Sequence, residues 1–539
     1  MKPSFDVLDK EERQSHRAAR RKSFVPKLRD VAVFLALVYA LYCYFFSKPL
    51  LAHPLPQHTG PYAVGTIDIE AAVTPPRTVH EARFKGTNEK AFELETVLFS
   101  LYYPVAHDTA GSADETKRHL WVPQPLSLRA QGYARAAHIS NWFTDSLFAA
   151  AINALVGDIT IPAAVDAPLS DYATPTSQKD TKTEKKSTPR NDGGPTGGFP
   201  IIIFSHGTVS ARTDYSHFAG ELAARGHVVV MLEHRDGSSP GTIIQQPGQP
   251  NRTRLLFDIT AVETPDHNLS LTEAEFHQAQ LAFRQAEIEA AVHILKRLNT
   301  GHGSAIAAQN PYREGHHTLP HWSNRLNTHA MVIAGHSYGA TGALQALRGG
   351  PTPERPFAGG VVLDPGKQSG PLNADVRVPL LVVHSNSWSS KRSVFYGGRA
   401  HFDVVKEIVE GNNKRGNPSW FMTSIGTSHP SVTDAPLLEP WLLSFTTGAT
   451  VDVYEGLRQY VHVVEDFLAF LAGGEVRGLM AEKAEFPEYD EGAVLGMGKP
   501  GQSGGKGMVE DLKKGEWTDW RRYWQIHVSP AGNVEKGGK

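Results

Sequence analysis

Short apolar runs alternate with helical patterns along most of this chain. Runs typical of buried strands occupy residues 199–204, 228–232, 330–334, 360–364, 378–384 and 421–425. Helical patterns lie between or after them, at 215–225, 273–298, 340–347 and 454–471. Strands that alternate with helices pair in parallel and need helices on both faces of the sheet. The pattern therefore predicts the α/β class, with a mostly parallel central sheet.

Two further patterns precede this core. Val97, Phe99, Leu101 and Tyr103 alternate with other residues, as in a half-buried strand. Residues 139–155 are predicted to form a helix. Phe143, Leu147, Ala151 and Leu155 recur on one face of it, and we call these four residues the apolar stripe. Such a stripe could pack on the core or touch a lipid surface, and both interpretations remain open.

The N-terminus carries a different pattern. Residues 1–30 are polar and basic, and an uncharged apolar segment follows from Val31 to Phe46. A transmembrane helix needs about 17–25 residues, so we predict a single-pass signal-anchor at 31–50. Positive charge before the segment predicts a cytoplasmic N-terminus, with the bulk of the chain on the lumenal or extracellular side. A cleaved signal peptide or a buried helix is the alternative.

Composition sets the domain boundaries. Residues 174–198 lack large apolar side chains and are rich in Thr, Lys, Pro and Gly, which predicts a flexible surface insertion. We place one α/β domain at 60–475, around this insertion, and a Gly- and Lys-rich C-terminal tail at 476–539.

Charge and cysteine content exclude several classes of function. Basic and acidic residues number 54 and 56, so nothing indicates a nucleic-acid partner. Cys43 is the single cysteine, which excludes intrachain disulfides and cysteine-based metal sites. Residues 299–328 read as a loop, and the four histidines in it, at 302, 316, 317 and 321, have irregular spacing. We therefore predict neither a metal nor a cofactor.

The candidate chemistry centres on Gly335-His336-Ser337-Tyr338-Gly339. This G-x-S-x-G stretch stands between a strand pattern and a helix pattern, the arrangement of a nucleophile elbow. The elbow exposes a serine hydroxyl above the sheet and places the next backbone N–H beside it. The stretch predicts a serine hydrolase with Ser337 as nucleophile, against the alternative of an ordinary glycine-rich turn.

A serine nucleophile needs a histidine base and an acid that orients the base. Asp364 and His429 each follow a strand pattern after Ser337, in the order Ser, Asp, His. An oxyanion also needs two backbone donors. Tyr338 follows the nucleophile, and Thr208 lies in an earlier strand-to-helix loop, so we predict these two N–H groups as donors. Asp364 and His429 could instead be loop residues.

Ordered sequence blocks resemble the platelet-activating-factor acetylhydrolases of the plasma and type II kind. The blocks are Gly60-Pro61-Tyr62-Ala63-Val64-Gly65, Leu101-Tyr102-Tyr103-Pro104, Leu120-Trp121-Val122-Pro123, Phe204-Ser205-His206-Gly207, Glu233-His234-Arg235-Asp236, the G-x-S-x-G stretch and Leu363-Asp364. The resemblance implies an α/β-hydrolase fold and calcium-independent release of a short or oxidised acyl group from the sn-2 position of a phospholipid. It also implies a triad of Ser337, Asp364 and His429, with Thr208 and Tyr338 as oxyanion donors.

The sequence departs from that family at several positions near the site. Tyr338 stands where the family usually has Phe, and Ala340 where it has Gly. Pro365 follows the acid and Pro430 follows the base. The last two changes bear on the acyl pocket. We expect a membrane-anchored phospholipid esterase; the alternatives are a carboxylesterase for a non-lipid ester and an inactive, hydrolase-like membrane scaffold.

Overall fold

The structure is a computed structural model. It describes residues 52–107, 118–171, 197–265, 271–390, 393–395, 398–440, 446–491 and 520–532, with scattered positions between 30 and 45. The chain divides into two compact units, Met1–Pro54 and Leu55–Lys539.

The first unit contains the predicted basic N-terminus and signal-anchor. Nearly all of 1–30 and much of 31–50 lie outside the described residues, and the described positions between 30 and 45 are helical and exposed. In the part of the chain that the structure describes, no helix is both long and apolar enough to cross a membrane. The predicted insertion at 174–198 also lies outside the described residues, apart from its last two positions.

The second unit is built on one large sheet. Its strands are β1 (Ala63–Phe84), β2 (Lys90–Val105), β3 (Ala164–Val165), β4 (Ile201–Ser205), β5 (Val228–Glu233), β8 (Val262–Glu263), β9 (Met331–His336), β10 (Phe357–Leu363), β11 (Leu380–Ser385), β12 (Ser419–Ser424) and β13 (Trp524–Val528). Their order is β13-β12-β11-β10-β9-β4-β5-β2-β1-β3, and β8 pairs with β1. A separate hairpin joins β6 (Gly241–Ile244) and β7 (Arg252–Leu255).

The centre of the sheet is parallel from β5 through β4, β9, β10 and β11 to β12. Antiparallel pairs flank it, since β2 pairs with β5 on one side and β13 pairs with β12 on the other. The parallel strands are buried along nearly all of their length and contain apolar runs, as expected where helices cover both faces. The predicted α/β class with a mostly parallel sheet is confirmed.

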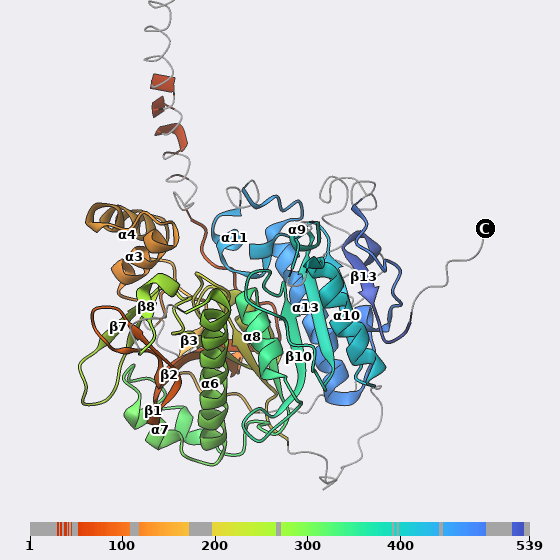
Figure 1. The fold of residues 1–539 in the computed structure, drawn as a ribbon, viewed down its shortest axis with the longest axis horizontal. Helices are drawn as coiled ribbons and strands as arrows, with labels where there is room; N and C mark the ends of the chain where they lie inside the picture. Colours follow the sequence, from red (N-terminus) through yellow and green to blue (C-terminus); the bar gives the residue numbers. More distant parts are fainter. Residues whose placement is uncertain are drawn as a thin grey trace, which may run out of the picture. The chain divides into compact units, whose positions relative to one another are not determined.

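Helices enclose the sheet from both sides (Figure 1). The helices are α3 (Leu126–Ala136), α4 (Trp142–Val156), α5 (Ser216–Ala223), α6 (Glu273–Asn299), α7 (Gly303–Gln309), α8 (Tyr338–Ala346), α9 (Asn386–Ser390), α10 (His401–Lys414), α11 (Ala435–Leu438) and α13 (Val453–Gly473). One core joins a sheet face to α6, α7, α8 and α10. The other joins the opposite face to α5, α11 and α13. Short 3₁₀ turns include η2 (Leu319–His321) and η4 (His429–Val432).

Three regions differ from the sequence expectation. Residues 96–105 of β2 are buried on both faces, because β1 and β5 flank the strand within the covered sheet. The segment 299–328, expected to be a loop, contains α7 and η2. Residues 524–528, assigned to the C-terminal tail, form the buried edge strand β13. The chain therefore returns to the sheet after residue 475, to cover the open edge of β12.

The helix α4 was expected either to pack on the core or to face lipid. Asn141 caps it with a reciprocal capping box, which fixes its start. Yet α4 has no buried residue, and Trp142, Phe143 and Leu147 are 83%, 59% and 56% exposed. Its main neighbour is α3. The apolar stripe therefore does not pack on the core.

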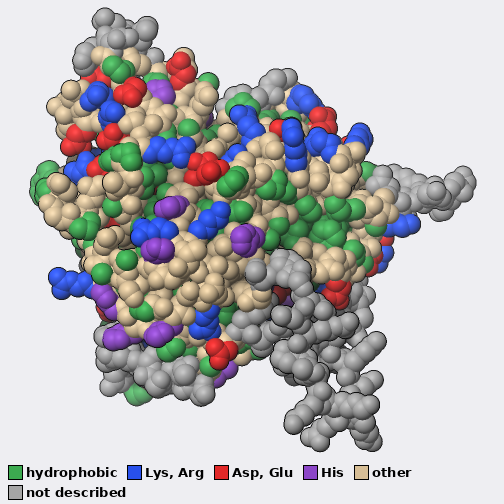
Figure 2. All heavy atoms as spheres, turned by 90° about the horizontal axis from the view of Figure 1, so that it is seen from below, with side chains coloured by type: hydrophobic (Ala, Val, Ile, Leu, Met, Phe, Trp, Pro, Cys, Tyr) green, Lys and Arg blue, Asp and Glu red, His purple; other side chains and the backbone are tan. Residues whose placement is uncertain are grey.

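The surface agrees with the balanced charge. On the face that Figure 2 displays, acidic and basic side chains are interspersed, and histidine side chains are scattered among them. No broad single-sign area of the kind that binds a polyanion is seen on that face.

Candidate active site

Ser337 occupies a sharp turn between β9 and α8. Its backbone has φ +56° and ψ −123°, a conformation that costs energy for a residue with a side chain. The two flanking glycines make the turn possible. A Cβ on Gly335 would lie 2.2 Å from the carbonyl oxygen of Gly339, and a Cβ on Gly339 would lie 1.9 Å from that of Ser205. The G-x-S-x-G spacing is thus a steric requirement of this turn.

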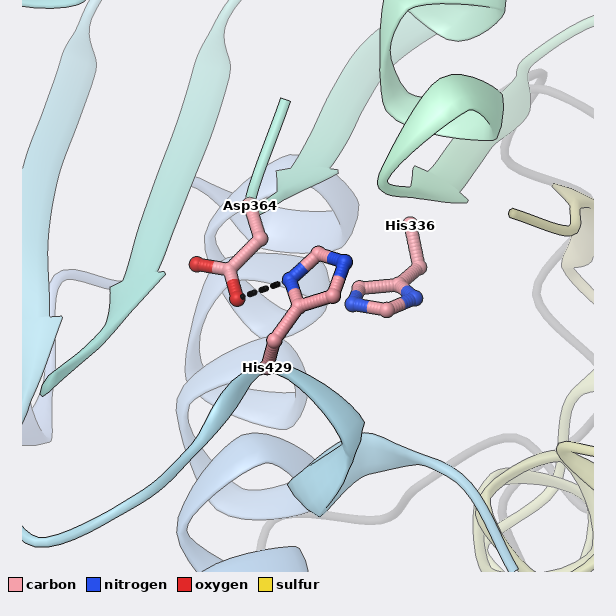
Figure 3. A group of neighbouring side chains, drawn as sticks. All are labelled: His336, Asp364 and His429. Atoms are coloured by element: carbon pink, nitrogen blue, oxygen red, sulfur yellow. Dashed lines mark hydrogen bonds and ion pairs between the residues drawn. The ribbon is translucent and has the colours of Figure 1, made fainter. Parts of the chain in front are cut away.

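The structure brings Ser337, His429 and Asp364 together at the carboxyl ends of three parallel strands. His429 Nε2 lies 3.1 Å from Ser337 Oγ, and His429 Nδ1 lies 2.8 Å from Asp364 Oδ2. Figure 3 shows the Asp364 carboxylate pointing at the ring of His429. Hydrogen bonds at these distances can pass a proton from the hydroxyl to the imidazole while the carboxylate fixes the ring.

Asp364 is held by its neighbours on β11. Its Oδ1 accepts from the Ser385 N–H at 2.6 Å, and its Oδ2 accepts from the Ser385 hydroxyl at 2.7 Å. The side chain is 2% exposed, and its backbone has φ +48°. This strained conformation aims the carboxylate at His429, and the buried donors keep it there.

A second histidine, His336, lies against the ring of His429 (Figure 3). The ring centroids are 4.4 Å apart. His336 Nδ1 lies 2.9 Å from the Tyr215 hydroxyl, which also accepts from the Gly207 N–H at 3.2 Å. Burial and the nearby His429 hold the pKa of His336 well below its usual value, so this ring is neutral. His336 and Tyr215 therefore link the elbow to the loop that contains Thr208.

Potential metal-ligating atoms converge at one group within the described residues. His336, Asp364 and His429 bring their ligand atoms within 4.8 Å of one another. Both nitrogens of His429 already have partners in Asp364 and Ser337. The hydrogen bonds from Asp364 through His429 to Ser337 therefore explain why these side chains lie together. The four histidines at 302, 316, 317 and 321 do not belong to it.

The predicted oxyanion residues lie on the same cleft as the serine. Thr208, Ser337 and Tyr338 all line it. The loop after β4 is closely packed, because a Cβ on Gly207 would lie 3.1 Å from Ser337 Cβ. Val209 adopts φ +57° and its N–H donates to the carbonyl of Ser238 at 2.7 Å. The Thr208 backbone is thus fixed close to the nucleophile.

The fully buried guanidinium of Arg284 contacts the loop that contains Thr208. Arg284 of α6 donates to Asp236 Oδ2 at 2.7 Å, to the His206 carbonyl at 2.7 Å and to the Ser238 hydroxyl at 2.6 Å. Its guanidinium also lies 4.5 Å from the centre of the Tyr338 ring. One side chain therefore contacts both segments that carry the predicted oxyanion donors.

The Glu233-His234-Arg235-Asp236 block is the other half of this buried network. Glu233 pairs with Arg129 and Arg212, Arg235 with Glu70, and Asp236 with Arg284, in a set of ion pairs whose side chains are at most 4% exposed. His234 Nδ1 lies 2.5 Å from Glu287 Oε2, and burial raises the pKa of Glu287 well above its usual value. Burial also lowers the pKa of His234 well below its usual value, so the proton of this pair stays on the carboxyl.

The cleft above Ser337 has a volume of about 1020 Å³. Its lining joins apolar side chains such as Leu256, Phe257 and Phe276 to polar ones such as Arg135 and Lys367. A cavity of this size and mixed character suits an amphiphilic molecule with a charged part.

All five residues proposed from the sequence lie at this site. Sequence reasoning missed Arg284 and Glu287, although a signal existed. Both fall on the buried face of α6, and Arg284 lies between Leu281 and Ile288 at helical spacing. A charge within an apolar stripe indicates a buried ion pair.

Comparisons with known proteins identify the family of this chain. The family described as "Platelet-activating factor acetylhydrolase, isoform II" matches residues 178–482, more than half of the chain. This chain belongs to that family. The predicted resemblance is confirmed.

Individual relatives are distant. A putative phospholipase A2 of Schizosaccharomyces pombe is 25% identical over 53% of this chain and 57% of its own length. A platelet-activating factor acetylhydrolase of Cavia porcellus is 25% identical over 62% of this chain and 61% of its own length. The match thus spans about three fifths of these relatives. Among solved structures, a ferulic acid esterase from Streptomyces cinnamoneus matches with a TM-score of 0.42 and 15% identity, over 77% of this chain and 91% of the esterase.

Proposed function

We propose that this protein is a serine esterase that hydrolyses the sn-2 acetyl, short or oxidised acyl ester of phospholipids resembling platelet-activating factor. The observation that carries the proposal is the hydrogen-bonded series from Ser337 through His429 to Asp364, on the cleft wall of a member of this family. The strand order and the elbow also support an α/β-hydrolase fold.

The reaction has two halves. His429 Nε2 takes the proton of Ser337 Oγ as this oxygen attacks the ester carbonyl, and the N–H groups of Thr208 and Tyr338 bind the oxyanion that forms. The tetrahedral intermediate collapses when His429 returns the proton to the leaving lysophospholipid oxygen. An acyl-enzyme remains on Ser337.

Water completes the cycle. It loses a proton to His429, attacks the acyl carbonyl and releases the free acid as Ser337 Oγ regains the proton. Throughout, Asp364 keeps His429 Nδ1–H oriented and offsets the positive charge on the ring. The nucleophile, the base, the acid and the oxyanion donors of this scheme are all groups of the chain itself, so we propose that the reaction is calcium-independent.

The test combines one variant with one substrate series. Ser337→Ala should remove labelling by a fluorophosphonate probe and lower kcat by several orders of magnitude. A series of phospholipids that differ only in sn-2 chain length, assayed with a chelator, should show activity confined to short or oxidised chains. Activity on soluble short esters alone would favour a non-lipid carboxylesterase. A wild-type protein that neither labels nor hydrolyses any ester would favour an inactive scaffold.

We also propose that the catalytic unit works at a membrane. The apolar segment 31–50 would anchor it, with the N-terminus in the cytoplasm and the catalytic unit on the lumenal or outer side. The exposed α4 supports a second contact, because its neighbour α3 and the turn after it supply Arg135 and His138 to the rim of the cleft. Alkaline carbonate extraction tests the anchor: the full-length protein should remain with the membrane pellet, and its release would refute the anchor.

A further inference from the structure

The end of β11 and the helix α9 that follows it contact the acid and the base of the proposed triad. The Ser385 N–H and hydroxyl bind the Asp364 carboxylate. The Ser387 hydroxyl accepts from the backbone N–H of His429 at 2.9 Å. Trp388, in α9 of the same segment, stacks on the ring of His429.

The stack is close and nearly parallel. The ring centroids of Trp388 and His429 are 4.0 Å apart, and the planes differ by 11°. The indole is itself fixed, since its Nε1–H donates to the Pro365 carbonyl at 3.0 Å. The ring of His336 also lies against His429, with the ring centroids 4.4 Å apart. The imidazole thus rotates little without breaking a contact.

A cation occupies a second position on the indole. Lys367 Nζ lies 4.5 Å from the centre of the Trp388 ring and donates to the Trp388 carbonyl at 2.8 Å. Among the described residues, the charged and titratable groups around His429 and its stacking partner include Asp364, His336, Lys367, His384, His401 and Tyr460.

The physical consequence concerns the charged form of the base. His429 becomes an imidazolium in each half of the proposed reaction, and the face of an indole attracts a cation. The positive charge of Lys367 opposes that attraction. The side chain of His429 is 30% exposed, so water screens part of both effects.

We propose that Trp388 is a positioning residue for the proposed base: its ring fixes the plane of His429 and stabilises the imidazolium that forms during acyl transfer. This inference rests on the proposed function. Trp388 also lines the cleft, so a simple role as part of the wall is the competing explanation.

The two roles differ in what a variant changes. Trp388→Leu keeps an apolar side chain but removes the π face, whereas Trp388→Phe keeps an aromatic ring. With a small neutral ester such as p-nitrophenyl acetate, we expect Trp388→Leu to lower kcat about 10-fold. The acidic limb of the kcat/KM pH profile should move to lower pH, because the imidazolium is less stable. Trp388→Phe should restore most of the kcat and the limb.

Lys367→Met supplies a second, opposite measurement. Loss of this positive charge should move the acidic limb to higher pH, since it no longer opposes the imidazolium. This variant also keeps the test decisive if Trp388→Leu fails to fold, which its melting temperature would reveal. Phe470→Leu is the matched control, because it removes a ring that lies 5.1 Å from Trp420, outside the cleft. It should leave kcat and the limb unchanged.

Three results would overturn the inference: equal kcat values for the Leu and Phe variants, a raised KM with an unchanged kcat and limb, or a limb in Lys367→Met that stays in place. Failure of the proposed function looks different, because then either the wild-type protein would hydrolyse no ester or Ser337→Ala would retain activity. An inactive Ser337→Ala beside a wild-type-like Trp388→Leu would sink only the role of Trp388.

Discussion

The carboxyl edge of the sheet holds its functional side chains with buried contacts, whereas helix α4 of the α3–α4 pair exposes its large apolar side chains. At the sheet edge, Ser337 and Asp364 adopt strained backbone conformations, and buried donors and ion pairs hold their surroundings. In α4, no residue is buried and large apolar side chains face outward. Strain persists only where the surrounding structure fixes it, so the first region is built for exact geometry.

The exposed side chains of α4, in contrast, are suited to contact with another apolar surface. Exposed apolar area on a well-capped helix costs free energy in water, and it is recovered only when the helix meets an apolar surface. The cleft lies where the two regions meet, since Ser337 and residues of and just after α3 line it together. We therefore propose that the carboxyl edge of the sheet performs the chemistry and that α4 helps to deliver an apolar substrate.

The largest expected effect breaks the geometry of the sheet edge. Asp364→Asn keeps the shape of the side chain but removes the charge that orients His429 Nδ1–H. We expect kcat to fall by about 10⁴-fold on a soluble ester, with the melting temperature changed little. Asp258→Asn, at an exposed position on the cleft rim, is the control for loss of a carboxylate. A kcat of Asp364→Asn within 10-fold of wild type would show that Asp364 does not orient the base.

The next effect concerns the buried network. Arg284→Met leaves Asp236 buried without its ion-pair partner, so the free energy of unfolding should fall by about 3–5 kcal/mol. Arg77→Met removes a surface pair with Glu289, in which Arg77 is 49% exposed, and should cost less than about 1 kcal/mol. Chemical denaturation measures both. Equal losses for the two variants would mean that Arg284 does no more than a surface arginine.

For the exposed apolar side chains of α4, we predict an effect that depends on the substrate. Trp142→Ser combined with Phe143→Ser removes two exposed rings from α4. Activity on a phospholipid in vesicles should fall roughly 10-fold or more, while kcat on a soluble ester stays unchanged. Val476→Ser alters another exposed apolar residue and should change neither activity. A parallel loss on both substrates would place α4 in the chemistry rather than in delivery.

The smallest effect per group is a pH dependence of stability. Burial lowers the pKa of His206 to about 4 and that of His527 to about 3, against about 6.5 when unfolded. As the pH falls below about 6.5, the unfolded chain binds protons that the folded protein does not. Stability should therefore fall by up to about 1.4 kcal/mol per pH unit for each such histidine.

Urea denaturation at pH 7, 6 and 5 would measure this slope. His527→Gln should make it shallower, whereas the same change at the exposed His329 should not. An identical slope in wild type and His527→Gln would contradict the prediction.

Much of the fold follows from local sequence. Apolar runs predicted β4, β5, β9, β10, β11 and β12, and periodicity predicted α5, α6, α8 and α13, because strand and helix periods are local properties. Strand β13 was missed, since it is brief, follows a long polar stretch and is stabilised only by pairing with β12. The full burial of β2 was missed for the same reason: the sequence does not state that β1 and β5 flank it.

The sequence by itself determined the elbow at Ser337 and the order of its partners, because glycine spacing and strand ends are local and sterically required. Only the tertiary structure decided which acid meets the base, that Arg284 supports the loop of Thr208, and that Trp388 stacks on His429. It also decided that the stripe on α4 faces outward. Each of these contacts joins residues from separate elements, and a pattern along the chain carries no information on which elements become neighbours.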